Sequence, residues 1–207
     1  MDPTPAAQAL VELADRYPGE LTVLAIGPLT NLATAIVLDP EWPTKIDRLV
    51  LMNGAFDVPN VLQELNSAYD PEATHLVYNC AAPLTIVPLD VTSWTSMRIG
   101  DVDRLAAATD PLARYLAAMV RPWVTWYSDR FLRDGCALHD PLAFATLVDP
   151  AVIALRRACV GVELQGALTR GRTISWDPQL WASRHHGVLA AATAAALGGL
   201  LLRRVAR

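Results

Sequence analysis

Three apolar segments recur in the first half of the chain, and each is followed by a turn and then by residues with helical spacing. They span residues 21–26, 48–52 and 84–89. Nearly continuous apolar strands are typical of parallel sheets that are covered on both faces. With helices at 30–38 and 70–79 between them, these segments predict an α/β fold with an open, mostly parallel, doubly wound sheet.

Further elements are expected on either side of these units. Residues 152–176 have the pattern of short strands around a turn, and helices are expected at 6–16, 102–108, 112–130 and 139–148. No internal repeat or low-complexity linker separates these elements, and 207 residues suit one α/β domain with a substantial core. We therefore predict a single domain over residues 1–207.

Charge and cysteine content exclude several classes of protein. The net charge is -4, and the only basic run lies at residues 203–207, so a nucleic-acid-binding surface is not expected. The cysteines Cys80, Cys136 and Cys159 are odd in number and widely spaced, which argues against a disulfide framework or a zinc site. Because the N-terminus also lacks the pattern of a signal peptide, we expect a cytoplasmic protein.

The apolar segment 188–202 raises the question of membrane attachment. It is uncharged and rich in Ala and Leu, but it is shorter than the roughly 20 residues that a membrane-spanning helix needs. A buried C-terminal helix is the favoured interpretation, and a membrane tether is the less favoured alternative.

A polar cluster lies in the segment that follows the second predicted strand. Open parallel sheets bind ligands beyond the carboxyl ends of their strands, and residues 57–69 follow such an end. This segment, interpreted as a long loop, contains Asn60, Glu64 and Asn66, a carboxylate flanked by two amides. Such a cluster can hydrogen-bond several hydroxyl groups of a sugar, but its polarity alone would favour an ordinary solvated loop.

A second candidate is the sequence His139-Asp140-Pro141 at the start of a predicted helix. An acid at that place is commonly just a helix cap. Here the neighbouring residues are apolar, which predicts partial burial, and a buried Asp needs hydrogen-bond donors or a cation. A hard cation such as calcium, which takes six to eight oxygen ligands, would be one solution.

Four segments, in this order and at compatible spacing, are similar to the inosine-uridine-preferring nucleoside hydrolases. They are 24–33 (Leu-Ala-Ile-Gly-Pro-Leu-Thr-Asn-Leu-Ala), 51–73 (with Met-Asn-Gly-Ala-Phe and Asp-Pro-Glu-Ala), 83–92 (Pro-Leu-Thr-Ile-Val-Pro-Leu-Asp-Val-Thr) and 139–143 (His-Asp-Pro-Leu-Ala). The resemblance covers roughly residues 6–180. It implies a sheet of the nucleoside hydrolase type.

The resemblance also implies a role for individual residues. The main-chain carbonyl of Ile26 and the carboxylate of Asp140 would bind Ca²⁺, and His139 would be the proton donor to the leaving base. The remaining residues would bind the substrate: Asn60, Glu64 and Asn66 at the ribose hydroxyls, Met52 lining the same pocket, and Tyr127 against the base.

The implied reaction is hydrolysis of the N-glycosidic bond of ribonucleosides to free base and ribose, as part of nucleoside catabolism and salvage. Cleavage of this bond builds positive charge on the ribose, which fixed carboxylate and amide oxygens would stabilise. Calcium would orient and activate the attacking water. The implied partner is a small-molecule ribonucleoside, and the family implies a homo-oligomer.

The chain departs from the family pattern in three places. The family signature Asp-x-Asp-Pro-Gly-x-Asp-Asp, which supplies two calcium ligands and the general base, does not occur in it. Asn53 stands where the family usually has Gly, and the spacing from Asn60 to Glu64 is shorter than usual. We therefore expect the chain to be about the C-terminal two-thirds of the family's domain, without its first strand and with an incomplete calcium site.

Two functional hypotheses follow. The first is a calcium-assisted ribonucleoside hydrolase, of which this chain alone is expected to be inactive or poorly folded. The alternative is a catalytically inactive remnant, or a non-catalytic subunit that binds a nucleoside or ribose or only packs against a homologue.

Overall fold

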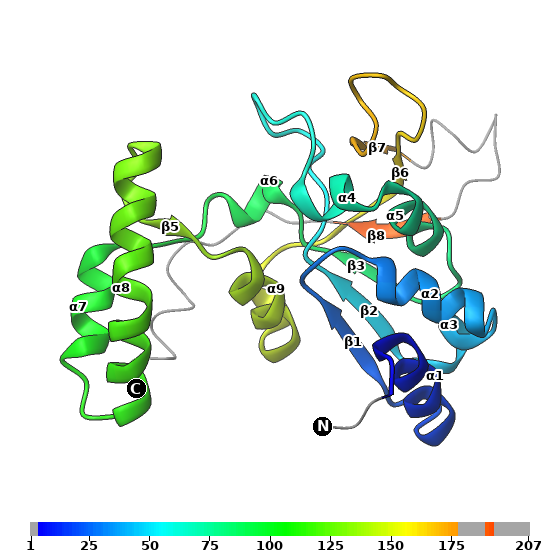
Figure 1. The fold of residues 1–207 in the computed structure, drawn as a ribbon, viewed down its shortest axis with the longest axis horizontal. Coiled ribbons are helices and arrows are strands. Elements are labelled where there is room, and N and C mark those ends of the chain that lie inside the picture. Colours follow the sequence, from blue (N-terminus) through cyan, green and yellow to red (C-terminus); the bar gives the residue numbers. More distant parts are fainter. Residues whose placement is uncertain (1–3, 178–188, 193–207) are drawn as a thin grey trace. The chain divides into compact units, whose positions relative to one another are not determined.

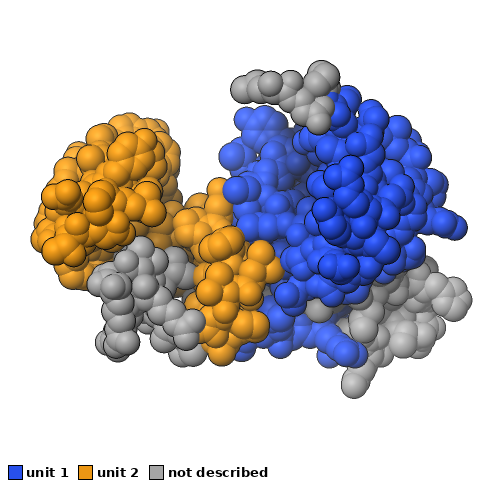
Figure 2. All heavy atoms as spheres, turned by 90° about the horizontal axis from the view of Figure 1, so that it is seen from below, with its two compact units in different colours: residues 1–90, 154–194 blue, residues 91–153, 195–207 orange. Residues whose placement is uncertain are grey.

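The computed structural model describes residues 4–177 and 189–192. The chain divides into two compact units (Figure 2). Unit 1 comprises residues 1–90 and 154–194, and unit 2 comprises residues 91–153 and 195–207. The expected single domain over residues 1–207 stays a prediction.

Unit 1 is built on one open sheet of six strands (Figure 1). The first four strands in spatial order run parallel, and the last two pair antiparallel, which confirms the mostly parallel α/β sheet. Their spatial order is β1 (Thr22–Ala25), β2 (Arg48–Leu51), β3 (Leu84–Ile86), β8 (Leu189–Ala192), β6 (Arg156–Val162) and β7 (Thr173–Trp176).

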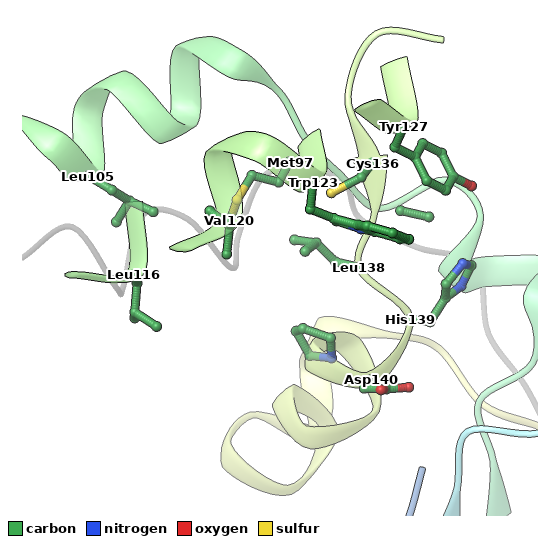
Figure 3. Close-up of a pocket in the computed structure, with 12 residues that line it drawn as sticks. Met97, Leu105, Leu116, Val120, Trp123, Tyr127, Cys136, Leu138, His139 and Asp140 are labelled. Carbon is green, nitrogen blue, oxygen red and sulfur yellow. The ribbon is translucent and has the colours of Figure 1, made fainter. Parts of the chain in front are cut away.

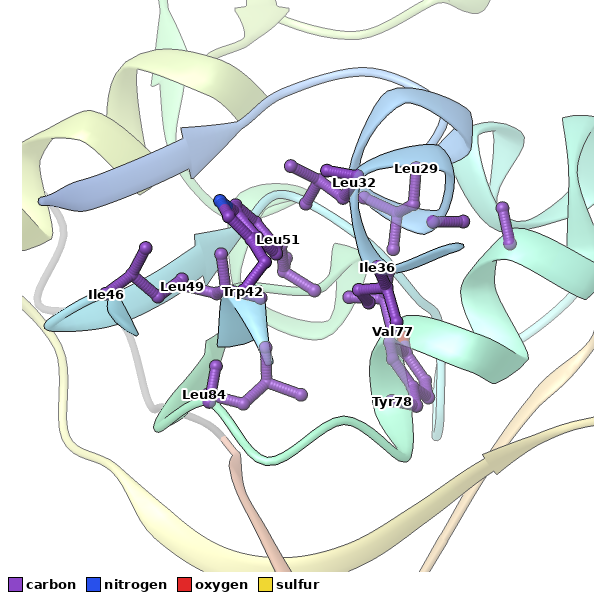
Figure 4. Packing of buried hydrophobic residues seen from close by; sticks show 14 of the residues in the cluster. Leu29, Leu32, Ile36, Trp42, Ile46, Leu49, Leu51, Val77, Tyr78 and Leu84 are labelled. Atoms are coloured by element: carbon purple, nitrogen blue, oxygen red, sulfur yellow. The ribbon is translucent and has the colours of Figure 1, made fainter. Parts of the chain in front are cut away.

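The helices of unit 1 pack with the strands around one apolar cluster (Figure 4). Leu49 and Leu51 of β2 meet Trp42 and Val77 in this cluster, and all four side chains are fully buried. Trp42 also donates a hydrogen bond from Nε1 to the carbonyl of Leu10, which ties two helices together. The helices of unit 1 are α1 (Ala6–Arg16), α2 (Thr30–Leu38), α3 (Trp42–Lys45), α4 (Leu65–Tyr69) and α5 (Pro71–Tyr78), and all of them except α4 contribute side chains to this cluster.

Unit 2 is mainly helical, with α7 and α8 packed against each other. Its core contains Val102, Leu105, Ala117 and Val124. The α8 helix starts where Asp110 accepts a hydrogen bond from the N–H of Leu112, and it ends at Leu132, whose backbone is left-handed. The elements are β4 (Ser96–Met97), α7 (Ile99–Ala106), α8 (Pro111–Phe131), β5 (Cys136–Ala137), α9 (His139–Val148) and the short 3-10 helix η1 (Pro150–Val152), while α6 (Leu89–Thr92) contains the boundary between the units.

Two sequence predictions about strands are wrong. The strand at 22–25 was expected to be covered on both faces, but all four of its residues are only partly buried. In the part of the chain that the structure describes, β1 lies at the edge of the sheet, so one side of it has no neighbouring strand. The third strand ends at Ile86, because Pro88 has no N–H to donate to the ladder, and the chain then turns into α6.

Two further segments also differ from the expectation. The segment 57–69 was interpreted as a loop, but it contains the short helix α4. Residues 189–192, which were expected to be helical, form β8 between β3 and β6. A short apolar run does not reveal from its pattern whether it is a buried helix or a buried strand. The rest of the segment 188–202 lies outside the described residues, and none of the described helices is long and apolar enough to cross a membrane.

Candidate active site

The turn after β2 is held by side chains from three other parts of unit 1. Four consecutive main-chain N–H groups, those of residues 54–57, donate to these side chains. The bonds run from Gly54 to Glu64 Oε2 (3.1 Å), from Ala55 to Thr173 Oγ1 (2.8 Å), from Phe56 to Asp90 Oδ2 (3.0 Å) and from Asp57 to Asp90 Oδ1 (2.7 Å).

Glu64 is the central anchor of this arrangement. Its side chain is only 2% exposed, and besides Gly54 it accepts hydrogen bonds from the N–H groups of Asn66 (2.7 Å) and Ser67 (2.9 Å). Glu64 is therefore the N-cap of α4 and at the same time fixes the turn after β2. A buried carboxylate with three donors is well compensated for its lost hydration. The expected contact of Glu64 with ribose stays a prediction.

The two predicted ribose-binding amides differ in their surroundings: Asn66 is hydrogen-bonded to the main chain, and Asn60 is exposed. Asn66 donates a hydrogen bond from Nδ2 to the carbonyl of Met52 at 3.0 Å, so Met52, Glu64 and Asn66 form one connected group at the carboxyl end of β2. Asn60, in contrast, lies exposed in the loop, with a left-handed backbone at φ 60°. Ile26 directly follows β1, and the N–H of Met52 donates to the carbonyl of the preceding Ala25 at 2.9 Å.

Asn53 has one unsatisfied hydrogen-bonding group. It is fully buried, and its Oδ1 accepts a hydrogen bond from the Tyr78 hydroxyl at 2.7 Å. Its Nδ2 has no partner among the described residues. The sequence signalled this position only as a departure from the usual Gly, and Tyr78 carried no functional signal.

His139 and Asp140 open α9 in unit 2, where they line a cavity of about 470 Å³ (Figure 3). The walls of this cavity are mainly apolar and include Trp123 and Tyr127 from α8. Trp123 stacks on Trp126, with ring centroids 4.9 Å apart and an interplanar angle of 26°. A cavity of this size with aromatic walls and a few polar groups is suited to a small aromatic molecule.

Burial shifts the pKa values of His139 and Asp140. Desolvation lowers the pKa of His139 below its usual value, and the nearby carboxylate of Asp140 opposes that shift. Desolvation likewise raises the pKa of Asp140, against the opposing effect of His139. Both shifts favour the neutral form, as expected where water is partly excluded.

The predicted calcium ligands do not fit a complete calcium site. Calcium takes six to eight oxygen ligands, whereas the resemblance assigns only the carbonyl of Ile26 and the carboxylate of Asp140. In residues 4–177 and 189–192, no group of three or more His, Cys, Asp or Glu side chains could hold a metal ion. The ligands named by the sequence therefore do not form a calcium site by themselves.

The predicted site residues thus fall into two sets, each described within its own unit. Met52, Glu64 and Asn66 are connected in unit 1, which also carries Ile26 and Asn60. Tyr127, His139 and Asp140 line one cavity in unit 2.

Sequence reasoning assigned no role to four residues around these sets: Asp90, Thr92, Thr173 and Trp123. The end of the third predicted strand does mark Asp90 as a place where a ligand could bind, but not as an acceptor for the turn after β2. Thr92 is its near neighbour in the sequence but carries no signal of its own. Thr173 is 118 residues away from Ala55, its partner, and no local pattern predicts such a contact.

Comparison with known proteins shows the family of the chain. The model of the inosine-uridine preferring nucleoside hydrolases matches residues 1–196, so the chain belongs to that family. It is 36% identical over 171 residues to the probable uridine nucleosidase 2 of Arabidopsis thaliana, a match that covers 81% of this chain and 53% of that protein. It is 34% identical over 182 residues to the pyrimidine-specific ribonucleoside hydrolase RihA of Shewanella woodyi, with 84% of this chain and 58% of that protein covered.

Solved structures agree in fold. A plant nucleoside hydrolase is similar with a TM-score of 0.89 and 26% identity, covering 99% of this chain and 65% of its own. The purine-preferring ribonucleoside hydrolase of Gardnerella vaginalis is similar with a TM-score of 0.82 and 29% identity, covering 94% of this chain and 62% of its own. The chain spans about half the length of the curated relatives that it matches.

Proposed function

We propose that the chain contributes the ribose-binding and base-binding parts of a ribonucleoside hydrolase. The net reaction adds the hydroxyl of water to C1′ of the ribose and the hydrogen of water to the leaving nitrogen. The C1′–N bond breaks, and its electron pair leaves with the base. The observation that carries the proposal is the unit 2 cavity, in which an imidazole and aromatic side chains line one space of about 470 Å³.

The cavity would hold the base. Tyr127 and Trp123 offer aromatic faces for stacking against it. His139 would donate to the base as negative charge develops on it, which lowers the barrier to its departure. The relatives give no single base preference, because their names include uridine nucleosidases and a purine-preferring hydrolase.

The connected group in unit 1 would bind the ribose. Asn66 is held by the carbonyl of Met52, and its Oδ1 would accept a hydrogen bond from a sugar hydroxyl. Asn60, exposed in the loop before α4, would add a second amide. Glu64 would act on the ribose either directly or through the turn that it holds. Fixed oxygens near the sugar would stabilise the positive charge of the transition state.

Calcium is proposed as the cofactor of the complete enzyme. The Ile26 carbonyl and the Asp140 carboxylate would supply two of its oxygens, and the others would come from water, substrate hydroxyls or protein beyond this chain. Bound calcium supplies an activated and oriented water in such sites. We also propose a cytoplasmic homo-oligomer that acts in nucleoside catabolism. The cytoplasmic location is supported by the three free cysteines in the described part of the chain.

A non-catalytic nucleoside-binding protein is the second candidate. The specific observation in its favour is that the assigned oxygens fall short of a calcium shell, while the groups suited to binding are present.

One experiment separates these functions. The purified chain is mixed with inosine or uridine, with and without calcium, and binding is followed by calorimetry and base release by chromatography. Release of base that disappears in H139Q would support the hydrolase and contradict our expectation that the chain alone is inactive. Binding without release would favour the second candidate, and the absence of both would contradict both functions.

A further inference from the structure

Thr92 contacts the proposed leaving-group residue through a single hydrogen bond. Its Oγ1 lies 2.7 Å from Nδ1 of His139, and its side chain is fully buried. Thr92 belongs to α6 and does not line the cavity, whereas His139 does. The hydroxyl therefore contacts the imidazole ring without occupying the space of a ligand.

The direction of this hydrogen bond follows from counting donors. A hydroxyl carries one proton, and a buried proton without an acceptor is destabilising. Among the described residues, Nδ1 of His139 is the only hydrogen-bond partner of Thr92 Oγ1. If Nδ1 carried the ring proton, the Thr92 proton would have no acceptor. The satisfied arrangement has Thr92 donating to Nδ1, and the neutral ring then carries its proton on Nε2.

We propose that Thr92 is a positioning residue that holds His139 in the Nε2–H tautomer and orients that N–H as a hydrogen-bond donor toward the leaving base. This inference rests on the proposed function. Negative charge appears on the base as the C1′–N bond breaks, and a donor in the cavity stabilises it. The proton that the base finally keeps comes from the water that attacks C1′. A ring with Nδ1–H would present a lone pair at Nε2 and would repel that charge.

The placement of the ring proton can be measured without any catalytic activity. The chain is labelled with ¹⁵N, and imidazole spectra are recorded at pH 7.5, with H139Q identifying the His139 signals among the four histidines. The expected result is a pyridine-type Nδ1 and a protonated Nε2 in the wild type and in T92S. A protonated Nδ1 in the wild type would overturn the proposal.

The orienting role is tested by two substrates with different leaving groups. Cleavage of inosine needs stabilisation of the negative charge on the leaving base. Cleavage of 4-nitrophenyl β-ribofuranoside releases a 4-nitrophenolate, which is a stable anion without a hydrogen-bond donor. T92V, which keeps the shape and loses the hydroxyl, is expected to lower kcat for inosine about tenfold or more and to leave the aryl riboside nearly unchanged. T92S is expected to restore most of the inosine activity.

An equal loss of kcat for both substrates in T92V would overturn the orienting role, because general damage to the fold would lower both activities alike. A T92S variant as inactive on inosine as T92V would also overturn it. If the wild type hydrolyses neither substrate, as expected for the chain alone, the proposed function fails only where nucleoside binding is also absent. Calorimetry with free hypoxanthine then decides the inference: weaker binding to T92V than to the wild type and T92S supports it, and equal binding contradicts it.

Discussion

The hydroxyl of Thr173 makes two hydrogen bonds with Ala55, accepting from its N–H at 2.8 Å and donating to its carbonyl at 2.9 Å. Both residues are buried, and 118 positions separate them in the chain. The pair joins β7, near the end of the described chain, to the turn after β2. That turn leads into the segment with the proposed ribose-binding residues. The outer antiparallel strand of the sheet thus stabilises the candidate site directly.

Replacing Thr173 by Val should destabilise unit 1. The change leaves a buried N–H and a buried carbonyl of Ala55 without partners, and each such group costs about 1–3 kcal/mol. Thr173→Ser should retain most of the stability, because it keeps the hydroxyl. Urea unfolding followed by circular dichroism measures the difference. Thr34→Val is the control, since Thr34 is exposed and its hydroxyl donates to the carbonyl of Thr30 within α2. Similar losses for the two Val variants would contradict the argument.

Gly54 should tolerate alanine much less well than Gly19. Both glycines have a positive φ, 88° and 76°, so an alanine at either place carries a backbone penalty of about 1–2 kcal/mol. Only at Gly54 would the new Cβ also meet other atoms, with the Tyr78 hydroxyl at 3.0 Å and the Phe56 ring at 3.2 Å. Such crowding typically adds about 1–3 kcal/mol. Thermal unfolding of G54A and G19A measures the difference, and equal values would show that the turn relaxes freely.

Glu64→Gln should lower stability although it is nearly isosteric. One of the two side-chain oxygens becomes an NH₂ group that faces main-chain donors, so at least one of the three N–H groups loses its acceptor. The expected loss is about 1–3 kcal/mol in the free energy of unfolding. Glu72→Gln serves as the control, because Glu72 is exposed and makes a surface ion pair with Arg170, worth about 0–1 kcal/mol. A loss in E64Q no larger than in E72Q would show that the carboxylate is not an anchor.

His139 should make the stability fall in mildly acidic solution. Burial lowers the folded-state pKa of His139, so the unfolded chain takes up the proton first as the pH falls. The contribution of neutral His139 to the free energy of unfolding is fully present above the unfolded-state pKa of about 6.5. It is lost as the pH falls through the folded-state pKa. Urea unfolding at pH 7.5 and pH 5.5 should therefore show a larger loss for the wild type than for H139Q. Parallel losses in the two proteins would contradict this assignment.

The sequence by itself determined most of the longer helices and the mostly parallel α/β class of the sheet. The α1 and α2 helices have the predicted bounds, and α5 begins where Asp70 accepts a hydrogen bond from the N–H of Ala73. Apolar spacing, helix caps and proline positions depend on residues only a few positions apart. They can therefore be recognised in any short segment of the sequence. The same local motifs were enough to predict family membership.

Only the tertiary structure decided which side chains form hydrogen bonds with distant parts of the chain. Glu64 was predicted as a sugar ligand, yet its carboxylate accepts three main-chain hydrogen bonds, because α4 and the turn after β2 leave N–H groups that need a buried acceptor. Residues 189–192 became a strand because β3 and β6 offer ladders on both sides. Thr173 meets Ala55, and Thr92 meets His139, through contacts between distant parts of the chain. Such contacts depend on how helices and strands that are far apart in the sequence pack together, and no local sequence pattern predicts that packing.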